Sequence, residues 1–304
     1  MRTSRFGFGC LLWTAFCSAA LMGGAPPTGK LENREAALFP VVIDGKWGYM
    51  NGQGELELSP RFDEARPFSE GLGAVREGAL WGYIDAKGEL AIRIQFDDAD
   101  LFSDGLALVR ICERYGYIDR DGRFVINPFY QAATTFSEGL AVVVWNRDTW
   151  FIDRDERQSQ QGRFKMIKSF AGDMAPAREN RLWGYIDRDG NWIIKPRFRY
   201  AYPFHEGLAL AQERGGYGFI DAKGKFVISP RFSIVGEKIT LFSEGLAAVR
   251  VKRHWGYIDR KGKMVIPATF DWAEPFRNGL AMVQVEHKTG YIDREGKWVW
   301  TPRR

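Results

Sequence analysis

The chain has 304 residues, of which 27% are charged, 45% hydrophobic and 14% aromatic. This composition is that of a folded protein with a well-supplied core rather than a disordered chain. The net charge is +5, and Arg2 and Arg5 contribute two of these charges. Because so small an excess makes no basic stripe, the charge argues against a nucleic-acid partner.

The first segment is a predicted signal peptide. Arg2 and Arg5 precede an uncharged apolar run at residues 6–22, and small residues follow at 23–25. A charged start, a short apolar middle and a small-residue end are typical of secretory signals. We therefore predict a signal peptide at residues 1–25, cleaved after Ala20 or Ala25, and a linker at 26–37. The mature chain would carry no membrane span and be periplasmic or secreted. The alternative is an uncleaved N-terminal anchor, because the run is at the lower length limit of a membrane span.

Cysteine usage excludes a disulfide framework. Cys10 and Cys17 lie in the predicted signal peptide, which leaves Cys112 alone in the mature chain. One thiol makes neither an intramolecular disulfide nor a zinc site. We expect Cys112 to be a strand residue rather than a nucleophile.

A repeat runs through residues 38–304, which we take as one β domain of eight units. Alignment on the tetrapeptide Trp-Gly-Tyr-Ile gives six spacings of 34 residues and one of 38. The eight copies begin at Trp47, Trp81, Tyr115, Thr149, Trp183, Tyr217, Trp255 and Thr289. Repeats of this length indicate stacked units that cover one another's cores.

Each unit contains three predicted strands. Trp-Gly-Tyr-Ile is aromatic and β-branched, as in Trp81–Ile84, and Asp-x-x-Gly then predicts a turn, as in Asp85–Gly88. A Val-Ile strand follows, as in Phe124–Ile126, and we expect the next proline, such as Pro128, to end its pairing. Gly-Leu-Ala-x-Val, as in Leu106–Val109, is close enough to the next Trp-Gly-Tyr-Ile to form a hairpin with it.

These strands predict an all-β fold of eight three-stranded antiparallel meanders, joined by longer irregular linkers and stacked as a curved solenoid-like array. A closed propeller-like ring is the alternative, although the period is shorter than that of usual four-stranded blades. Two recurrent aromatic positions in the linkers are predicted to pack the units together. They are Phe62, Phe96, Tyr130, Phe198, Phe232 and Phe270, and Phe68, Phe102, Phe136, Phe204, Phe242 and Phe276.

The fourth unit is degenerate near residues 149–173. Thr149-Trp150 replaces Trp-Gly, and the polar run 154–161 stands where a Val-Ile strand belongs. We expect a solvated, lengthened turn there, with the strand supplied late by Phe164–Ile167. The irregularity is either neutral drift or a functional bend.

No residue pattern indicates catalysis, a cofactor or a metal. His205, His254 and His287 occupy different repeat positions, and Arg120 separates Asp119 from Asp121 in a sequence that only superficially resembles a calcium loop. The acids before Gly-Leu are a better site candidate, because stacking would align them. They are Glu70, Asp104, Glu138, Glu206 and Glu244. We favour a simpler role for them, as turn residues that bind local amides.

Aromatic side chains outside the consensus are the candidate interaction surface. The consensus Trp and Tyr share one strand face and are expected in the core. The candidates for exposure are Trp145, Trp192, Trp272, Trp298 and Trp300.

The motifs Trp-Gly-Tyr-Ile-Asp-x-x-Gly and Phe-Ser-Glu-Gly-Leu-Ala resemble those of the bacterial WG-repeat family, also called KWG repeats. The resemblance covers Leu38 to Arg304 and departs from the pattern in unit four, at Tyr115, Tyr217 and Thr289. It implies an all-β repeat domain, often in exported bacterial proteins, with an interaction role and no assigned catalytic residues.

Our functional hypothesis is a non-enzymatic scaffold that binds an unidentified protein partner outside the cytoplasm. It rests on the long repeated surface and on the lack of a visible nucleophile–base pair. The alternative is binding of cell-wall glycan through exposed aromatics, and an enzyme is the third and weakest hypothesis.

Overall fold

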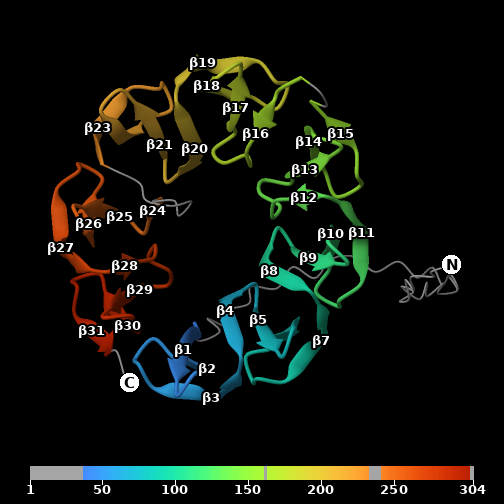
Figure 1. The fold of residues 1–304 in the computed structure, drawn as a ribbon, viewed down its shortest axis with the longest axis vertical. Coiled ribbons are helices and arrows are strands. Elements are labelled where there is room, and N and C mark those ends of the chain that lie inside the picture. Colours follow the sequence, from blue (N-terminus) through green and yellow to red (C-terminus); the bar gives the residue numbers. More distant parts are fainter. Residues whose placement is uncertain (1–36, 161–162, 233–240, 302–304) are drawn as a thin grey trace, which may run out of the picture. The chain divides into compact units, whose positions relative to one another are not determined.

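The computed structural model describes residues 37–160, 163–232 and 241–301, and the predicted signal peptide lies outside them. The described residues form 31 β-strands in eight antiparallel sheets, which are the blades of a ring (Figure 1). In chain order, blade 1 is β1–β3, blade 2 is β4–β7, and each later blade takes the next four strands, up to β28–β31 in blade 8.

Each full blade has an innermost, a second, a third and an outermost strand (Figure 1). The innermost strands are β4 (Glu64–Ser69), β8 (Asp98–Ser103), β12 (Ala132–Ala133), β16 (Met166–Ile167), β20 (Tyr200–His205), β24 (Phe242–Ser243) and β28 (Trp272–Ala273). The second strands are β1 (Phe39–Ile43), β5 (Leu72–Glu77), β9 (Leu106–Ile111), β13 (Ala141–Trp145), β17 (Ala175–Glu179), β21 (Leu208–Glu213), β25 (Leu246–Val251) and β29 (Leu280–Val285).

The third strands contain the Trp-Gly-Tyr-Ile motif. They are β2 (Lys46–Met50), β6 (Leu80–Ile84), β10 (Arg114–Ile118), β14 (Asp148–Ile152), β18 (Leu182–Ile186), β22 (Gly216–Ile220), β26 (His254–Asp259) and β30 (Lys288–Asp293). The outermost strands are β3 (Leu56–Phe62), β7 (Leu90–Phe96), β11 (Phe124–Tyr130), β15 (Gln158–Ser159), β19 (Trp192–Phe198), β23 (Phe226–Phe232), β27 (Met264–Phe270) and β31 (Trp298–Trp300).

The solenoid-like array predicted from the repeat is wrong, because the eight blades close into a propeller. Blade 1 packs against blade 8 through a shared apolar cluster that contains Phe39, Val41, Tyr291 and Trp300. The Tyr291 hydroxyl also donates a hydrogen bond of 2.7 Å to the Pro40 carbonyl. An open array would leave the apolar faces of its two end units exposed, whereas a ring buries both.

The three-stranded unit is also wrong for seven of the eight blades. The segments predicted to be irregular linkers contribute the innermost strands, such as β8, which pairs with β9 from Ser103↔Leu106 to Asp98↔Arg110. The two recurrent aromatic positions pack as predicted. Phe102 and Phe136, for example, are each 1% exposed. Phe68 is the half-buried exception among the inner aromatics.

The glycine of the Trp-Gly motif allows the outermost strand to cross close to the third strand. A Cβ atom added to Gly82 would lie 2.7 Å from the Ile92 carbonyl oxygen, and one added to Gly116 would lie 2.6 Å from that of Ile126. Both approaches are shorter than van der Waals contact, so only glycine fits. The strand registers shift at the same place, which marks a β-bulge.

Proline does not end the outermost strands as predicted. Pro128 lies inside β11 and Pro196 inside β19. An outermost strand has one free edge, so a residue without an amide proton is tolerated there.

The Asp-x-x-Gly turn forms as predicted between the third and outermost strands. The Asp85 carboxylate accepts hydrogen bonds from the amides of Lys87 and Glu89, both at 2.9 Å. Gly88 closes the turn onto the Asp85 carbonyl and has φ of 82°, a conformation that favours glycine. Cys112, predicted to be a strand residue, instead lies exposed in the turn after β9.

The motif tyrosines, present in all blades except blades 4 and 6, join their blades to the next. The hydroxyl of Tyr83 donates to the carbonyl of Asp100 at 2.7 Å, and that of Tyr257 donates to the carbonyl of Glu274 at 2.8 Å. In both cases the acceptor belongs to the innermost strand or turn of the following blade. Each ring also packs against the inner phenylalanine of that blade, as Tyr83 does against Phe102 at 5.0 Å.

Burial raises the pKa of these tyrosines well above the ordinary value of 10.0. They are Tyr49, Tyr83, Tyr117, Tyr185, Tyr257 and Tyr291. Because the folded pKa is raised, the stability they contribute is complete below pH 10 and falls as the pH rises above it. In an alkaline titration we expect their ionisation, followed by ultraviolet absorbance, to coincide with loss of the β-sheet circular dichroism. Gradual ionisation of all tyrosines near pH 10 with unchanged dichroism would contradict this expectation.

Blade 4 lacks both the motif glycine and the apolar Val-Ile segment. Trp150 occupies that position in β14, and the outermost strand is reduced to Gln158–Ser159, which pairs only with Ile152 and Phe151. The polar run therefore forms a short strand rather than only a turn. Phe164 and Ile167 are buried, but Ile167 belongs to the innermost strand of blade 5. They do not supply a late outer strand, so that part of the prediction is wrong.

Among the residues that the structure describes, none forms a helix of the length and apolarity needed to span a bilayer.

Candidate functional site

A cavity of about 280 Å³ lies on the inner side of the ring where blade 1 meets blades 2 and 8. Most of its lining is apolar, with a polar rim. The lining includes Leu38, Phe39, Pro40, Trp47, Ala65, Pro67, Phe68, Leu101, Pro275, Leu280, Met282 and Tyr291, with Arg66, Asp100, Glu274, Arg277 and Asn278 as its polar members.

The cavity borders blade 1, for which the described residues supply three strands. Blade 1 consists of β1, β2 and β3, and among the described strands β1 pairs only with β2. In every other blade the equivalent second strand pairs on its inner side with an innermost strand. The inner edge of β1 therefore has no strand partner in the part of the chain that is described (Figure 1).

Phe39 replaces a small residue that the other blades require. The seven equivalent residues are Gly73, Ala107, Ala141, Ala175, Ala209, Ala247 and Ala281. They are small because the inner-strand phenylalanine lies over them. A Cβ atom added to Gly73 would lie 2.6 Å from the Phe68 ring, and Phe68 pairs with Gly73 in the strand register. In blade 1 the side chain of Phe39 takes part of this space.

Tyr291 changes both of its usual partners at the ring closure. The other motif tyrosines pack against a phenylalanine of the next inner strand, but Tyr291 packs edge-on against Phe39 at 5.7 Å. Its hydroxyl donates to the carbonyl of Pro40 in β1 rather than to a carbonyl near an inner strand. Blade 8 is thus held directly by the second strand of blade 1, and the cavity lies beside this contact.

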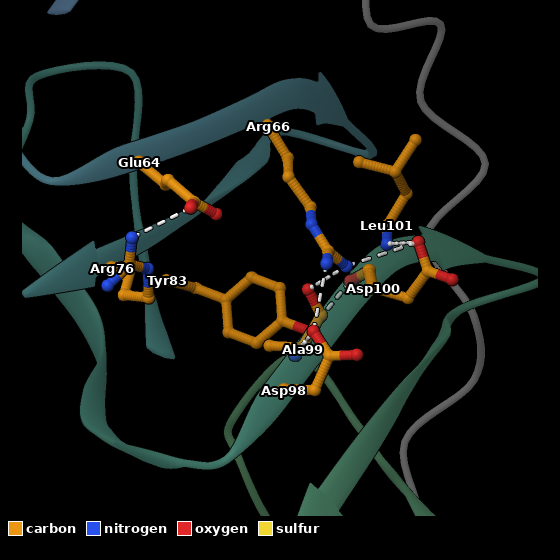
Figure 2. Close-up of polar contacts among 8 residues, drawn as sticks. All are labelled: Glu64, Arg66, Arg76, Tyr83, Asp98, Ala99, Asp100 and Leu101. Atoms are coloured by element: carbon orange, nitrogen blue, oxygen red, sulfur yellow. Dashed lines mark hydrogen bonds and ion pairs between the residues drawn. The ribbon is translucent and has the colours of Figure 1, made fainter. Parts of the chain in front are cut away.

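Arg66, one of the polar lining residues, is fixed by contacts between blades 2 and 3 (Figure 2). Arg66 donates to the Asp98 carboxylate at 2.8 Å and to the Ala99 carbonyl at 2.7 Å. Its guanidinium also lies 4.4 Å from the centre of the Trp81 ring. The rim arginine is therefore held in place rather than freely rotating.

Lys168 occupies the same repeat position in blade 5. It donates to the Ala201 carbonyl at 2.9 Å and lies 3.8 Å from the centre of the Tyr202 ring. Burial lowers the pKa of Lys168 to about 8. Cations at this position are therefore a feature of inter-blade packing, and only the one in blade 2 faces the cavity.

The acids before Gly-Leu join the blades in series. Each carboxylate accepts a hydrogen bond from a turn amide of the next blade, for example Gly139 to Asp104 at 2.8 Å and Gly245 to Glu206 at 2.9 Å. Glu70, Glu138 and Glu244 bind the amides of Gly105, Gly172 and Gly279 in the same way. The prediction that these acids bind local amides is wrong, since each amide belongs to another blade.

A serine precedes four of the five acids and makes a second inter-blade bond. Ser69 donates to the Phe102 carbonyl at 2.7 Å, and Ser103 donates to the Phe136 carbonyl at 2.8 Å. Ser137 and Ser243 repeat the contact with Phe170 and Phe276. Phenylalanine, serine and acid thus form a three-residue tie from an inner strand to its neighbouring blade.

The cavity combines an apolar lining with the inner edge of β1. Within the described ranges no three acidic, histidine or cysteine side chains are placed to hold a metal ion. The Asp119 carboxylate is used within its own turn, where it accepts amides from Asp121 and Arg123 at 3.0 and 2.9 Å. An unpaired strand edge beside an apolar cavity is suited to an extended polypeptide.

The five tryptophans predicted as an interaction surface are not brought together. Trp145 belongs to blade 4, Trp192 to blade 5, and the other three to blade 8. Trp298 is 40% exposed, whereas Trp145, Trp192 and Trp272 are half-buried. The expectation of exposure is wrong for Trp300, which is 5% exposed and packs in the ring-closing cluster.

Trp145 has the most platform-like surroundings of the five. Its ring stacks on Phe129 at 4.3 Å with an angle of 28° between the planes, and Phe129 is 50% exposed. The guanidinium of Arg114 lies 4.8 Å from the centre of the Trp145 ring. Trp272 instead donates from its indole nitrogen to the Glu274 carboxylate at 2.9 Å.

The cavity residues were not among the predicted site residues. A signal for them does exist in the sequence, because Phe39 departs from the small residue found at that position in the seven other units. The position becomes informative only once the preceding segment is known to form an innermost strand in the other blades.

Comparison with known proteins agrees with the fold. A family model described as WG containing repeat matches residues 47–81, 81–111, 115–150, 183–217, 217–252 and 255–288. No curated protein sequence matches the chain.

Solved structures with a similar fold include the dihydro-heme d1 dehydrogenase NirN in complex with DHE, with 14% identity, a TM-score of 0.57, and coverage of 90% of this chain and 74% of that one. The extracellular domain of a hybrid two-component system of B. thetaiotaomicron has 12% identity and a TM-score of 0.53, with coverage of 88% of this chain and 44% of that one. A eukaryotic initiation factor has 11% identity and a TM-score of 0.50, with coverage of 88% of this chain and 85% of that one. At these identities the likeness shows the fold alone.

Proposed function

The chain belongs to the WG containing repeat family, and on this premise we propose that it is a non-enzymatic scaffold that binds a partner protein outside the cytoplasm. The observation that carries the proposal is the inner edge of β1, which adjoins an apolar cavity at the closure of the ring. Radial repetition leaves a propeller with only short, protected strand edges, so an edge that adjoins an apolar cavity is suited to recognition.

The rigidity of the surroundings supports a binding role. The cavity is framed by blades that are tied to each other through Arg66 and through the Tyr291 hydroxyl. A preorganised surface loses little conformational entropy when a partner binds.

Location outside the cytoplasm is supported by the sequence of residues 1–25, with its charged start and apolar middle. Intact-mass measurement of the protein from its native host should show the chain shortened at Ala20 or Ala25. A mass that includes Met1 or Arg2 would contradict cleavage.

Site-specific photo-crosslinking tests the binding role. With a benzophenone amino acid at Pro67, which lines the cavity, we expect a discrete covalent adduct with an envelope protein in living cells. Pro203 occupies the same repeat position in blade 6 and does not line this cavity, so the same probe there is the matched control. No adduct from position 67, or equal adducts from both positions, would refute the proposed binding site.

Glycan binding is the second candidate function, and the stacked pair of Phe129 and Trp145 favours it. Sugars stack on exposed aromatic rings, and Arg114 beside the pair offers hydrogen-bond donors. Retention on insoluble peptidoglycan should then fall with Trp145→Ala and persist with Trp272→Ala. If neither substitution changes the retention, binding of glycan through these aromatic side chains is refuted.

A further inference from the structure

Blade 1 keeps the receiving surfaces for an innermost strand. In blades 2, 3 and 4 three side chains tie an inner strand in place: a phenylalanine that packs beside the motif tyrosine of the preceding blade, a serine and an acid. Blade 2 offers the Phe68 carbonyl and the Gly71 amide at the positions that receive the serine and the acid elsewhere. The cavity beside Tyr291 lies where the aromatic ring belongs.

The chain's own preceding residues do not carry this triad. At the 34-residue spacing, Phe68, Ser69 and Glu70 of blade 2 correspond to Arg34, Glu35 and Ala36. Glutamate has no hydroxyl to donate to a carbonyl, and alanine has no carboxylate for an amide. All three tying side chains are therefore missing from this segment, although the other inner strands repeat most of them.

We propose that the inner edge of β1 and the adjoining cavity bind an extended segment of a partner protein with the sequence aromatic-Ser-acidic, which completes blade 1 as its fourth strand. This inference rests on the proposed function and specifies the chemistry of the partner. Main-chain pairing with β1 supplies affinity, and the side chains supply specificity, as in other cases of strand addition.

Each side chain of the segment has a defined counterpart. The aromatic ring enters the cavity next to Phe39 and Tyr291, which are lined up edge-on at 5.7 Å. The serine hydroxyl donates to the Phe68 carbonyl, as Ser69 does to the Phe102 carbonyl. The carboxylate of the acid accepts a hydrogen bond from the Gly71 amide, as the Glu70 carboxylate does from the Gly105 amide. Its negative charge therefore faces the amide donors of a turn.

A second copy of this chain is a poorer occupant. Its Phe-Ser-acid sequences are already bound within their own ring, for example through Ser103 to Phe136 and Asp104 to Gly139. Exchange would break these contacts in the donor ring, so the observations favour a different protein with an unstructured segment. Dimerisation of the pure protein with loss of peptide binding would contradict this choice.

The test uses a fluorescent octapeptide with the sequence of residues 64–71, Glu-Ala-Arg-Pro-Phe-Ser-Glu-Gly, and the full-length chain. Fluorescence anisotropy should show saturable binding. Replacement of the peptide phenylalanine by alanine should weaken binding at least about tenfold, because a buried aromatic anchor contributes most of the affinity of such contacts. No binding, or equal binding of the two peptides, would overturn the inference without any change to the protein.

Protein variants place the peptide in the cavity. Ala65 lines the cavity and Ala133 has the same repeat position in blade 4 outside it. Ala65→Phe should abolish peptide binding while Ala133→Phe retains it, with folding of both verified by circular dichroism. Equal binding by two folded variants would place the peptide elsewhere and overturn the inference.

A gain-of-function variant tests the triad itself. Arg34→Phe, Glu35→Ser and Ala36→Glu together introduce the three tying residues into the sequence that precedes β1. We expect this triple variant to lose peptide binding, because an intramolecular strand at high effective concentration outcompetes the peptide. If the unaltered chain bound peptide only after deletion of residues 26–36, its own segment would be the occupant and the inference would be wrong.

Failure of the inference and failure of the proposed function are distinguishable. If position 67 gives adducts but the peptide does not bind, the proposed function stands and the inference fails, because the protein partner then lacks the triad. Peptide binding without any adduct from Pro67 would confirm the chemistry of the groove and refute its use by a partner in the cell.

Discussion

Phe39→Ala is expected to destabilise the protein by about 3–5 kcal/mol, the range for loss of a buried phenylalanine. The direction is opposite to what the repeat consensus predicts, since alanine is the residue at this position in six of the seven other units. Elsewhere the small residue lies under an inner phenylalanine, but at the ring closure Phe39 itself is 5% exposed and packs against Tyr291, where it takes part of that space. Denaturant unfolding monitored by tryptophan fluorescence measures the change.

The matched comparison for this variant is Ala209→Gly in blade 6, which alters the same repeat position and leaves the covering Phe204 in place. It should cost about 1 kcal/mol, mainly from backbone entropy. A Phe39→Ala protein as stable as the unaltered chain would show that blade 1 is not closed by this side chain.

Gly82→Ala is expected to destabilise the protein by about 3 kcal/mol, at the upper end of the cost of overpacking. The added Cβ atom would lie 2.7 Å from the Ile92 carbonyl oxygen and 2.8 Å from the backbone of Arg93. These atoms belong to the hydrogen-bonded strand β7 and move only if the outermost strand detaches. Blade 4 has Trp150 at this position and a polar run in place of the Val-Ile segment, and its outermost strand has only two residues.

Gly52→Ala is the control for this substitution. An added Cβ atom at Gly52 has only the Phe39 ring within 4 Å, at 3.9 Å. We expect the free energy of unfolding to change by less than about 1 kcal/mol. The folded protein has room for the methyl group, and the substitution otherwise only lowers the conformational entropy of the unfolded chain. Equal effects of the two glycine substitutions would refute the steric explanation of the Trp-Gly motif.

The sequence predicted the repeat, the three outer strands and the Asp-x-x-Gly turn, because each depends on local periodicity and turn chemistry. It did not predict the innermost strands. Their pairing residues, such as Asp98 and Ala99, are small or polar and have weak strand propensity. They form strands because the two neighbouring blades hold them, the preceding blade through its tyrosine and the next blade through the serine and acid contacts, which no single unit reveals.

The closure of the ring was beyond the sequence for a related reason. The curvature of the ring depends on how much of the space between neighbouring blades each inner strand occupies. This depends on side-chain packing, which the repeat pattern does not reveal. The cavity was missed as well, because Phe39 and Tyr291 are 252 residues apart and approach each other only in a closed ring. In the sequence alone, Phe39 is one departure from the repeat consensus and gives no indication of a structural role.

The claim on which the account depends is that blade 1 has two neighbours, blade 2 and blade 8. One turn position of the repeat is suitable for labelling, because blade 3 has a natural cysteine there, Cys112. The equivalent residues in blades 1, 2 and 8 are Asp44, Gly78 and Glu286. Spin labels on cysteines at 44 and 286, in a Cys112→Ser background, should give by double electron–electron resonance the same distance as labels at 44 and 78. A distance several times longer for the 44–286 pair would mean an open array, and the propeller would be wrong.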